Sequence, residues 1–529
     1  MYRDNFKEPL RDYLEKTGQI DSKGSKLTTN TETSGRYHSD WLNFMYPRLR
    51  LARSLLKNEG VIFVSIDDHE VHNLRKIMDE IFGEENFIAI LPTVMNLKGN
   101  QDQFGFAGTH EYTIVFAKNK NLANIGEFDI SEEEMLEWTE DEYGYYKKGA
   151  ELKATGTNAP REKRPNLYYP IFVTPENNIY VTENDKLPIH RKKMGDSIVL
   201  PITNGKEMSW RWEKKKVDKE KYNVIIERGK NDSIRIYKKQ RPKIGDLPSK
   251  KPKSLFYKPE YSSGNGTIQL KEIFGERIFD NPKPIDLIKD IIQISTEPEG
   301  DLVLDFLAGS GTTGHAIWDL NKYDDGKRKF ILINLDEPID DNQLTGKNAI
   351  KLGLYTVADI CIERLKRVSK KYREEEQQKL SKNNQEFGFK VFRLDKSNFN
   401  LKDEFKISEK DDTQELKKKY LDWLGHWVRE PLVGNWKPID VVYEIVLKEG
   451  LNLNSKIEEM KIKNNDFYHV VDNRKELEFY ITLDKKIMQE TIKEIRTMKY
   501  RDKMFCFLDK ALSDNDKINL RSFVKLKVI

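Results

Sequence analysis

The sequence predicts an α/β protein, and three segments carry that prediction. An apolar run, Leu302–Phe306, precedes a turn of small residues and an apolar segment, His315–Leu320, which is the order strand, turn, helix. A second apolar run, Lys329–Leu335, follows as another strand. Near the start of the chain, Val61–Ile66 lies between two segments whose apolar residues recur at helical spacing. Strands that alternate with helices are typical of mixed sheets covered by helices.

Composition limits the class of protein. The chain has 529 residues, enough for several domains, and a net charge of only +4 from 91 basic and 87 acidic residues. That balance argues against a uniformly basic coat for nucleic acid but allows local basic faces. The two cysteines, Cys361 and Cys506, have neither metal-ligand spacing nor the number for a disulfide framework. No apolar run approaches the roughly 20 residues of a membrane helix, and the N-terminus is polar rather than signal-like. We therefore expect a cytoplasmic protein with no membrane partner.

The first part of the chain reads as alternating elements. They are a charged, partly helical segment over Met1–Gly18, a polar loop over Ser22–Arg36, a helix from His38 through Leu56, a strand over Val61–Ile66 and a helix over Glu70–Ile81. The polar residues after the strand are interpreted as strand-end and helix-cap groups: Asp67, Asp68, His69 and His72.

The turn after Leu302–Phe306 is the strongest functional signal. Gly309, Gly311 and Gly314 fit a G-x-G-x-x-G pattern between a strand and a helix. Glycine lets the backbone approach a ligand, and the unpaired N–H groups of the helix start face it. A glycine-rich turn is also common as a purely structural feature. The context favours a nucleotide or nucleoside cofactor. A nicotinamide-dependent oxidoreductase is an alternative, but it would place this turn after an N-terminal first strand.

A carboxylate follows the next predicted strand. Asp336 and Glu337 come directly after Lys329–Leu335. A carboxylate in that place accepts hydrogen bonds from both ribose hydroxyls of a nucleoside. The alternative is that one of the two caps a loop. The segment over 356–366 is then predicted as a helix.

Several motifs resemble a known family. The residues Asp305-Phe306-Leu307-Ala308-Gly309-Ser310-Gly311-Thr312-Thr313 resemble the D-P-F-x-G-S-G-T-T motif of amino-methylating DNA methyltransferases, without its proline. The stretch over 35–87 and the motif Thr109-His110-Glu111-Tyr112 resemble methylation (Mod) subunits of type III restriction–modification systems. The resemblance covers nearly the whole chain, and the chain is identified as a member of the beta group of adenine-specific enzymes.

The resemblance implies a cofactor, S-adenosyl-L-methionine, and a set of residues that bind it. Asn281-Pro282-Lys283-Pro284 resembles the motif that flanks the methionine part of the cofactor, with Gly264–Thr267 as a loop beside the same pocket. The family favours Glu337 over Asp336 as the ribose ligand. No metal is implied. The predicted cofactor-binding residues are Asp305, Phe306, Ala308, Gly309, Ser310, Gly311, Thr312, Thr313, Glu337, Asn281, Lys283 and Pro284.

The resemblance also implies a permuted Rossmann-like methyltransferase core with two further domains. The expected division is a catalytic half over 1–118, an inserted α+β target-recognition domain over 119–255, a cofactor-binding half over 256–368, a charged linker or solvated helix over 369–384, and an α+β assembly domain over 385–529. The implied activity is methyl transfer to the N6 amine of a flipped adenine at a specific site in double-stranded DNA. The implied partners are a restriction (Res) subunit and a second copy of the chain.

One family motif is absent. The tetrapeptide Asp-Pro-Pro-Tyr, which holds the amine of the flipped base in the family, does not occur in the sequence. No catalytic residue is therefore assigned, and the chain is expected to begin just downstream of the catalytic strand. Two hypotheses follow: a methyltransferase whose missing strand is encoded upstream, or an inactive module that binds cofactor and DNA. A sheet without that strand is expected to have exposed edges.

The predicted recognition domain interleaves cations with aromatic residues, which suits phosphate contact and base stacking. Its short strands are expected over Asn178–Val181 and Ser233–Tyr237. A solvated insert with solubilising lysines is the alternative; placement between the two family halves favours DNA contact. The residues are Tyr145, Tyr146, Lys147, Lys148, Arg161, Lys163, Arg164, Trp210, Arg211, Trp212, Lys214–Lys216 and Lys250–Lys253.

The C-terminal region is expected to begin near Phe387–Leu394 as a separate α+β unit. Its tryptophans Trp423, Trp427 and Trp436 are expected to pack a core.

Overall fold

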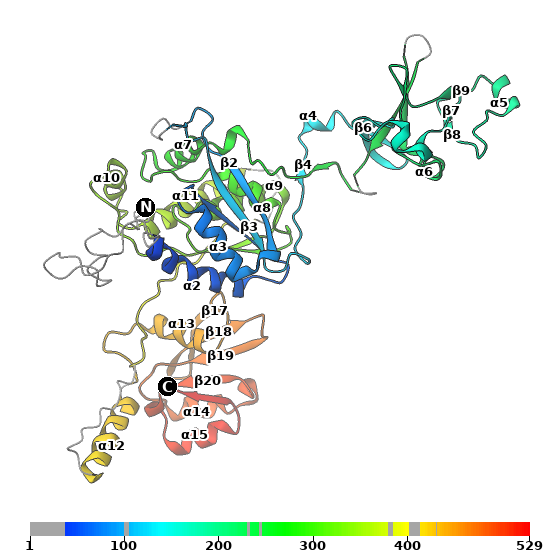
Figure 1. Ribbon diagram of the computed structural model, residues 1–529. Coiled ribbons are helices and arrows are strands. Elements are labelled where there is room, and N and C mark those ends of the chain that lie inside the picture. The colour runs from blue at the N-terminus through cyan, green and yellow to red at the C-terminus, as the bar shows by residue number, and fades with distance from the viewer. Residues whose placement is uncertain are drawn as a thin grey trace. The chain divides into compact units, whose positions relative to one another are not determined.

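The structure is a computed structural model that describes residues 38–99, 105–229, 233–242, 246–378, 385–400, 413–429 and 431–529. The chain forms two compact units, residues 1–387 and 388–529, shown in Figure 1. The predictions for Met1–Gly18 and Ser22–Arg36 lie outside the described residues. In the part of the chain that is described, no helix has the length and apolar character to cross a membrane.

The N-terminal part of the first unit is a three-stranded antiparallel sheet covered by two helices. The strands β1 (Val61–Ile66), β3 (His110–Ala117) and β2 (Phe87–Val94) lie side by side in that order. The helices α2 (Ser39–Leu55) and α3 (Val71–Phe82) bury their apolar faces, including Leu49, Leu74 and Met78, with Phe116 of β3. The helix, strand and helix predicted for this part of the chain are confirmed, because the helical spacing of α3 presents one continuous apolar stripe.

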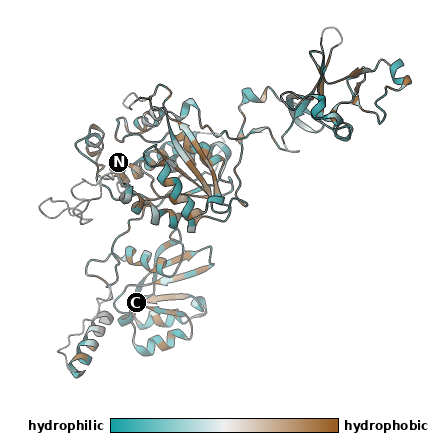
Figure 2. Ribbon diagram, viewed as in Figure 1, coloured by the Kyte–Doolittle hydropathy of each residue, from teal (hydrophilic) through white to brown (hydrophobic). Residues whose placement is uncertain are grey.

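The second sheet of this unit is short. β15 (Leu302–Asp305) and β16 (Lys329–Leu332) pair in parallel, and α8 (Ile285–Gln293) packs with α9 (Thr312–Asp324) against them through Ile292, Ala316 and Ile317. Hydrophobic residues line this core and that of the three-stranded sheet in Figure 2. Among the described residues, no strand pairs with the second edge of β1 or with the second edge of β15.

Two details of the second sheet differ from prediction. Leu302 is 56% exposed, so the apolar run over Leu302–Phe306 is not buried along its whole length. β16 ends at Leu332 and not at Leu335. The N–H of Ile333 still donates to the carbonyl of Asp305 at 2.8 Å, but its own carbonyl then accepts from Ala308, and the chain leaves the sheet around the glycine turn.

Three more helices complete the first unit's core: α7 (Ser263–Phe274), α10 (Leu344–Lys351) and α11 (Val357–Gln378). The loop predicted over Gly264–Thr267 is wrong, since these residues form the first turn of α7. A Cβ on Gly266 would lie 2.1 Å from the carbonyl oxygen of Pro282, so glycine allows this helix to approach the Asn281–Pro284 segment. α11 continues the helix predicted over 356–366 as far as Gln378 and buries Tyr372.

Residues 119–255, here called the recognition segment, form small antiparallel sheets. One has the order β12 (Val224–Arg228), β13 (Ile234–Gln240), β6 (Gly144–Glu151), β5 (Thr139–Asp141). Another has the order β8 (Ile179–Tyr180), β7 (Ile171–Val173), β9 (Ser197–Val199), and β10 (Ile202–Thr203) pairs with β11 (Lys206–Glu207). β4 (Phe128–Asp129) and β14 (Ser249–Lys250) pair, and α4 (Glu132–Met135), α5 (Ile189–Lys193) and α6 (Lys214–Lys219) are short helices. The strands predicted over Asn178–Val181 and Ser233–Tyr237 correspond to β8 and β13.

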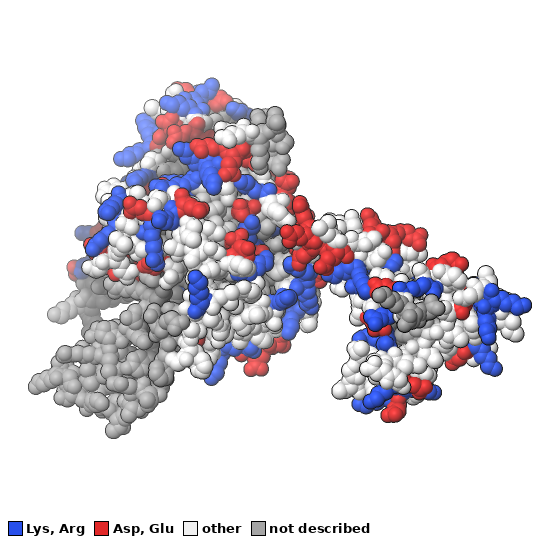
Figure 3. Space-filling view, turned by 90° about the horizontal axis from the view of Figure 1, so that it is seen from above, with Lys and Arg blue, Asp and Glu red and all other residues white. Residues whose placement is uncertain are grey.

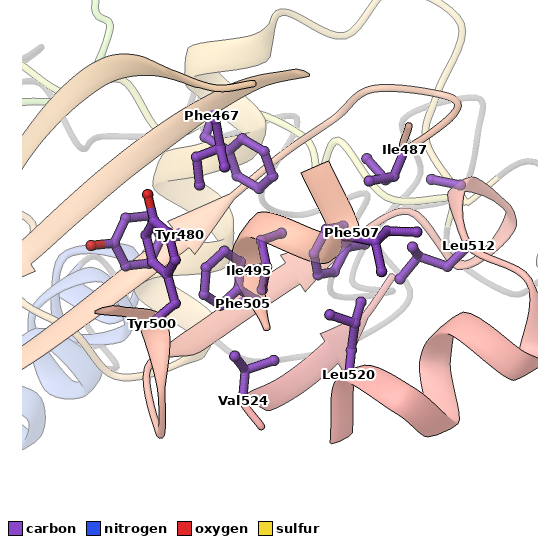
Figure 4. Close-up of a cluster of buried hydrophobic side chains, with 13 residues drawn as sticks. Phe467, Tyr480, Ile487, Ile495, Tyr500, Phe505, Phe507, Leu512, Leu520 and Val524 are labelled. Carbon is purple, nitrogen blue, oxygen red and sulfur yellow. The ribbon is translucent and has the colours of Figure 1, made fainter. Parts of the chain in front are cut away.

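The second unit is a five-stranded sheet with helices. The strands lie in sequence order: β17 (Lys456–Ile462), β18 (Asn465–Asp472), β19 (Leu477–Ile481), β20 (Met504–Phe507) and β21 (Lys525–Val528). α13 (Pro438–Lys448) packs in one core, and α14 (Gln489–Ile495) and α15 (Asp514–Arg521) pack in another, an aromatic cluster that includes Phe467, Tyr480 and Phe505 (Figure 4).

The tryptophan prediction for this unit holds in part. Trp436 packs against the α13 core. Trp423, on α12 (Thr413–Arg429), belongs to none of the described cores and instead stacks on Tyr420, with ring centroids 5.7 Å apart. The side chain of Trp427 lies outside the described residues. Phe387 is buried against Trp318 and Tyr372 of the first unit.

Candidate functional site

The glycine turn, residues 306–311, joins β15 to α9. Its two glycines with positive φ, Gly309 and Gly311, differ in how strictly the surrounding packing requires glycine. Gly309 and Gly311 have φ of +51° and +78°. A Cβ on Gly311 would lie 2.8 Å from Sγ of Cys361 on α11. At Gly309 the nearest atom would be 3.7 Å away, on the ring of Phe279. Gly311 is therefore needed for packing and conformation, whereas at Gly309 a Cβ would make only ordinary van der Waals contacts and glycine is favoured by the positive φ alone.

Backbone and amide hydrogen bonds fix the shape of the turn. The N–H of Ala308 donates to the carbonyl of Ile333 at 3.2 Å, and the N–H of Gly311 donates to the carbonyl of Ala308 at 2.8 Å. The amide Nδ2 of Asn334 donates to the carbonyl of Gly309 at 3.1 Å. Sequence analysis did not find Asn334, because the predicted strand over Lys329–Leu335 included it. In the structure β16 ends at Leu332, and Asn334 lies beyond it.

Asp305 holds the turn from the strand side. Its carboxylate accepts from the N–H of Leu307 at 3.1 Å and from the Thr313 hydroxyl at 2.6 Å. Burial raises the pKa of the Asp305 carboxyl, and the two hydrogen bonds counteract that rise only in part. Both oxygens are engaged within the turn, so Asp305 acts on the shape of the turn.

The turn keeps donors available. Among the described residues, the N–H groups of Gly309 and Ser310 have no acceptor. Thr312 and Thr313 are the first two residues of α9, whose N–H groups have no carbonyl one turn back within the helix. Unpaired N–H groups at a helix start favour an anionic or strongly accepting ligand. The turn therefore fits the polar part of a nucleoside cofactor.

A buried arginine lies behind the turn, and sequence analysis missed it. Arg364 of α11 is 0% exposed. Its Nη1 donates to Oγ1 of Thr312 at 2.7 Å and to Oγ of Ser310 at 3.1 Å. The sequence signal was weak, because Arg364 lies in a helix that contains many lysines and arginines. The sequence does not distinguish the one that is buried from those that face water.

His315 connects this arginine to two other helices. Its Nδ1 lies 3.4 Å from Nη2 of Arg364, and its Nε2 lies 3.1 Å from the hydroxyl of Tyr372. Tyr372 donates to Asp319 at 3.1 Å, and Lys289 of α8 donates to the same carboxylate at 2.6 Å. Burial, assisted by the charge of Arg364, lowers the pKa of His315 well below its usual value, which keeps the imidazole neutral.

The Asn281–Pro284 segment lies beside the turn through Phe279, the neighbour of Gly309. Asn281 is exposed and has a φ of +50°, while Pro282 and Pro284 are buried. Lys283 forms an ion pair with Glu111 of β3. The side chain of Gln269 accepts from the N–H of Ile285 at 2.9 Å and so caps α8. This brings the predicted Lys283 together with the Thr109–Tyr112 motif.

The remaining predicted residues are placed less directly. Phe306 packs against the α2–α3 core. Glu337 is half-buried and Asp336 is exposed, five and four residues beyond the end of β16. The carbonyl of Glu337 accepts from the N–H of Val357 at 3.0 Å, at the start of α11, the helix that contacts Gly311 through Cys361. Of the two carboxylates, Glu337 is the one tied to the element behind the turn.

Near β1, the exposed Asp67 accepts from the N–H of His69 at 3.1 Å and closes the strand-end turn. The helix cap expected of this group is absent among the described side chains, because Glu70 is the N-cap of α3 and makes no capping hydrogen bond.

The recognition segment corrects part of the DNA-contact prediction. Trp210 and Trp212 are only 2% and 8% exposed and lie in the core of the segment, so neither ring is available for stacking. Many cations already have carboxylate partners: Lys147 with Glu137, Lys148 with Glu227, Arg161 with Glu207, Lys214 with Asp185, Lys216 with Glu220 and Lys250 with Glu134.

Other cations of the segment are exposed and have no carboxylate partner among the described residues, for example Lys163, Arg164 and Lys215, and the short helix α5 adds two more. Lys192 and Lys193 are exposed and have no carboxylate partner among the described residues. In Figure 3, blue side chains gather at the far right, the end of the segment that carries α5 in Figure 1. Sequence analysis overlooked α5 because its run of cations is short and contains no aromatic residue.

Comparison with known proteins identifies the family of the chain. The DNA methylase family matches residues 16–341. The chain is 46% identical to the Mod subunit of the type III restriction–modification enzyme EcoPI of Escherichia phage P1, over 74% of this chain and 58% of that protein. It is 32% identical to the type II methyltransferase M.KpnI of Klebsiella pneumoniae, over 63% of this chain and 75% of that protein. It is 31% identical to the Mod subunit of EcoP15I of Escherichia coli, over 77% and 61%.

The chain thus spans somewhat less than two thirds of the Mod subunits that it matches. The match to the DNA methylase family covers the three-stranded sheet, the recognition segment, and the glycine turn with Asp305 and Glu337. The chain belongs to the DNA methylase family and is similar to Mod subunits of type III restriction–modification enzymes.

Proposed function

We propose that this protein is the Mod subunit of a type III restriction–modification system, a site-specific DNA methyltransferase that acts on the N6 amine of adenine. The observation that carries the proposal is the 46% identity to the EcoPI Mod subunit. The cofactor is S-adenosyl-L-methionine, which supplies an activated methyl group. The fold is the permuted Rossmann-like core, in which the elements around β1 precede the glycine turn in the chain.

The residues of the turn would bind and orient the cofactor. The N–H groups of Gly309, Ser310, Thr312 and Thr313 would face its polar groups, while Asp305 and Asn334 hold the turn in shape. Glu337 would accept from the ribose hydroxyls, and Asn281, Lys283 and Pro284 would border the methionine end. Alignment of donor and acceptor lowers the barrier of such a transfer without a covalent intermediate.

The recognition segment would supply sequence recognition in double-stranded DNA. The unpaired lysines of α5 can contact phosphates directly. Paired cations such as Lys148 must first exchange a carboxylate for a phosphate. We therefore assign α5 a larger share of the binding than the aromatic positions Trp210 and Trp212, which are buried. The second unit would serve assembly, both with a second copy of the chain and with a Res subunit.

The proposal is tested by titrating the purified chain with S-adenosyl-L-methionine in a calorimeter, beside the variants Asp305→Ala and Glu337→Ala. We expect saturable binding that both variants weaken, followed by transfer of labelled methyl groups to adenine in DNA. A folded wild-type chain that binds no cofactor would contradict the proposal.

The alternative is a module of the same family that binds cofactor and DNA without transferring the methyl group. The lack of an Asp-Pro-Pro-Tyr tetrapeptide in the sequence favours it. Binding of S-adenosyl-L-methionine and DNA with no methyl transfer to any of a set of random-sequence duplexes would support this alternative.

A further inference from the structure

Arg364 is a buried cation whose described hydrogen-bond acceptors are all uncharged. Its acceptors are the carbonyl of Ser310 at 3.4 Å, the Ser310 hydroxyl at 3.1 Å, the Thr312 hydroxyl at 2.7 Å and Nδ1 of His315 at 3.4 Å. All are neutral. No carboxylate in the described part of the chain forms an ion pair with it, and its Nε has no partner. Burial lowers the pKa of Arg364 to about 10, so the guanidinium remains charged at neutral pH.

Such a group is costly to bury. Removing a guanidinium from water is compensated only when its donors find acceptors, and an ion pair is the usual compensation. Here three of the four contacts are made to the residues that follow Gly309, and none to a carboxylate. The fold therefore places a positive charge directly behind the turn, and within the described part of the chain neither this charge has an ion-pair partner nor the N–H groups of Gly309 and Ser310 an acceptor.

The surrounding hydrogen bonds have only one consistent direction. Arg364 can only donate, so Nδ1 of His315 accepts and its Nε2 carries the proton. That N–H donates to Tyr372, whose hydroxyl donates to Asp319. The chain of bonds ties α11 to α9, and Lys289 adds α8. Arg364 is thus held by hydrogen bonds to the turn and to His315, which is itself held by Tyr372.

We propose that Arg364 is a positioning residue for the cofactor. Its fork fixes Ser310 and Thr312 so that the N–H groups of the turn keep their aim, and its charge adds to theirs in favour of a carboxylate at the turn. The amino-acid end of S-adenosyl-L-methionine carries the one carboxylate of that ligand. This inference rests on the proposed function, and the closing experiment separates the two.

The variants are Arg364→Met, which removes the charge at similar length, and Arg364→Lys, which keeps the charge but not the fork. Arg367→Met is the matched control, because Arg367 lies one turn later on α11 and pairs with Glu363 at 2.9 Å, away from the turn. Each is titrated with S-adenosylhomocysteine, which has the carboxylate, and with methylthioadenosine, which lacks it.

We expect Arg364→Met to bind S-adenosylhomocysteine about tenfold more weakly or worse, the size of a lost charge-assisted contact, and methylthioadenosine with a much smaller loss. Arg364→Lys should recover part of the difference, and Arg367→Met should bind both ligands like wild type. A folded Arg364→Met protein with wild-type affinity for both, or with equal losses for both, would overturn the inference.

Hydrogen exchange of the peptide that contains Ser310–Thr313 is measured without ligand on the same proteins. Faster exchange in Arg364→Met and in Arg364→Lys, but not in Arg367→Met, is expected if the fork holds the turn, and unchanged exchange would overturn that part. If the wild type binds neither ligand, the proposed function fails, and the exchange result still decides the role of Arg364. If Arg364→Met does not fold, Thr312→Val against Thr312→Ser decides: only the valine variant, which loses the acceptor of Nη1, should exchange faster and lose affinity.

Discussion

The glycine turn and the recognition segment use charge in opposite ways. At the turn, Arg364 and His315 are buried and Asp305 is partly buried, and their hydrogen bonds join the turn to α9 and α11. In the recognition segment, many cations lie at the surface and several of them pair with carboxylates, as Lys148 does with Glu227. Removing one partner of a buried polar group leaves the other partner unsatisfied, which costs stability. A surface ion pair contributes little to stability, and its members exchange partners easily. A single substitution behind the turn should therefore cause a large loss of stability or binding, whereas a single substitution of a surface cation in the segment should cause a small loss.

The largest expected effect is a loss of stability on removing a tryptophan of the recognition segment, because these tryptophans belong to its core. Trp210→Ala should lower the free energy of unfolding by about 3–5 kcal/mol, the usual cost of removing a buried aromatic side chain. The Nε1 of Trp210 also donates to the carbonyl of Tyr169 at 2.7 Å. Denaturant unfolding checks this. Tyr143→Ala, at a ring that is 43% exposed, is the control and should cost less than about 1 kcal/mol. A stable Trp210→Ala protein that has lost only DNA binding would restore the stacking role.

The next effect compares the two glycines of the turn. Gly311→Ala should destabilise the first unit by about 2–4 kcal/mol, because a left-handed φ and a clash with Cys361 add together. It should also abolish measurable cofactor binding. Gly309→Ala meets only the strain, about 1 kcal/mol, and should keep the fold. Thermal unfolding and calorimetry measure both, and equal losses in the two variants would show that packing on α11 is not what selects Gly311.

A smaller effect is expected at α5. The double variant Lys192→Gln with Lys193→Gln should weaken DNA binding roughly tenfold at low salt and reduce the salt slope of the binding constant by about two. Lys366→Gln with Lys370→Gln removes the same charge from exposed positions of α11 and is the control. Fluorescence anisotropy at several salt concentrations checks this. Equal losses in the two double variants would mean that net charge alone, and not α5, sets the affinity.

The smallest effect concerns pH. Burial first, and then the charges of Arg364, Lys371, Lys289 and Lys322, lower the pKa of His315 below its ordinary 6.5. Below about pH 6.5 the unfolded chain therefore binds a proton on this histidine, whereas the folded chain does not. The free energy of unfolding that depends on neutral His315 is complete above that pH and decreases as the pH falls. His315→Gln cannot titrate. Its stability should depend less on pH between 7 and 5.5, by at most about 1.4 kcal/mol per pH unit. Parallel curves for the two proteins in denaturant titrations at each pH would contradict the neutral assignment of His315.

The same two regions also differ in how well the sequence alone predicted them. The elements from His38 to Ile81 were predicted to within one residue, and the order of strand, turn and helix around Gly311 was predicted although α9 begins three residues earlier and ends four residues later than expected, because spacing and glycine content are local properties. The recognition segment was predicted as a cationic and aromatic surface, and its tryptophans proved to be core. Composition gives the same pattern for a buried ring and for an exposed one, and only the packing of Tyr169, Ile171 and Trp210 distinguishes them.

The sequence by itself determined the α/β class, the place of the glycine turn and the family, since each depends on residues close together in the chain. The tertiary structure decided that Leu302 is exposed, that Asn334 and Arg364 hold the turn, and that Lys283 meets Glu111. Arg364 and Ser310 are 54 residues apart in sequence. Contacts at such separations depend on how helices pack on sheets, and no local pattern records which cation will be buried and which will face water.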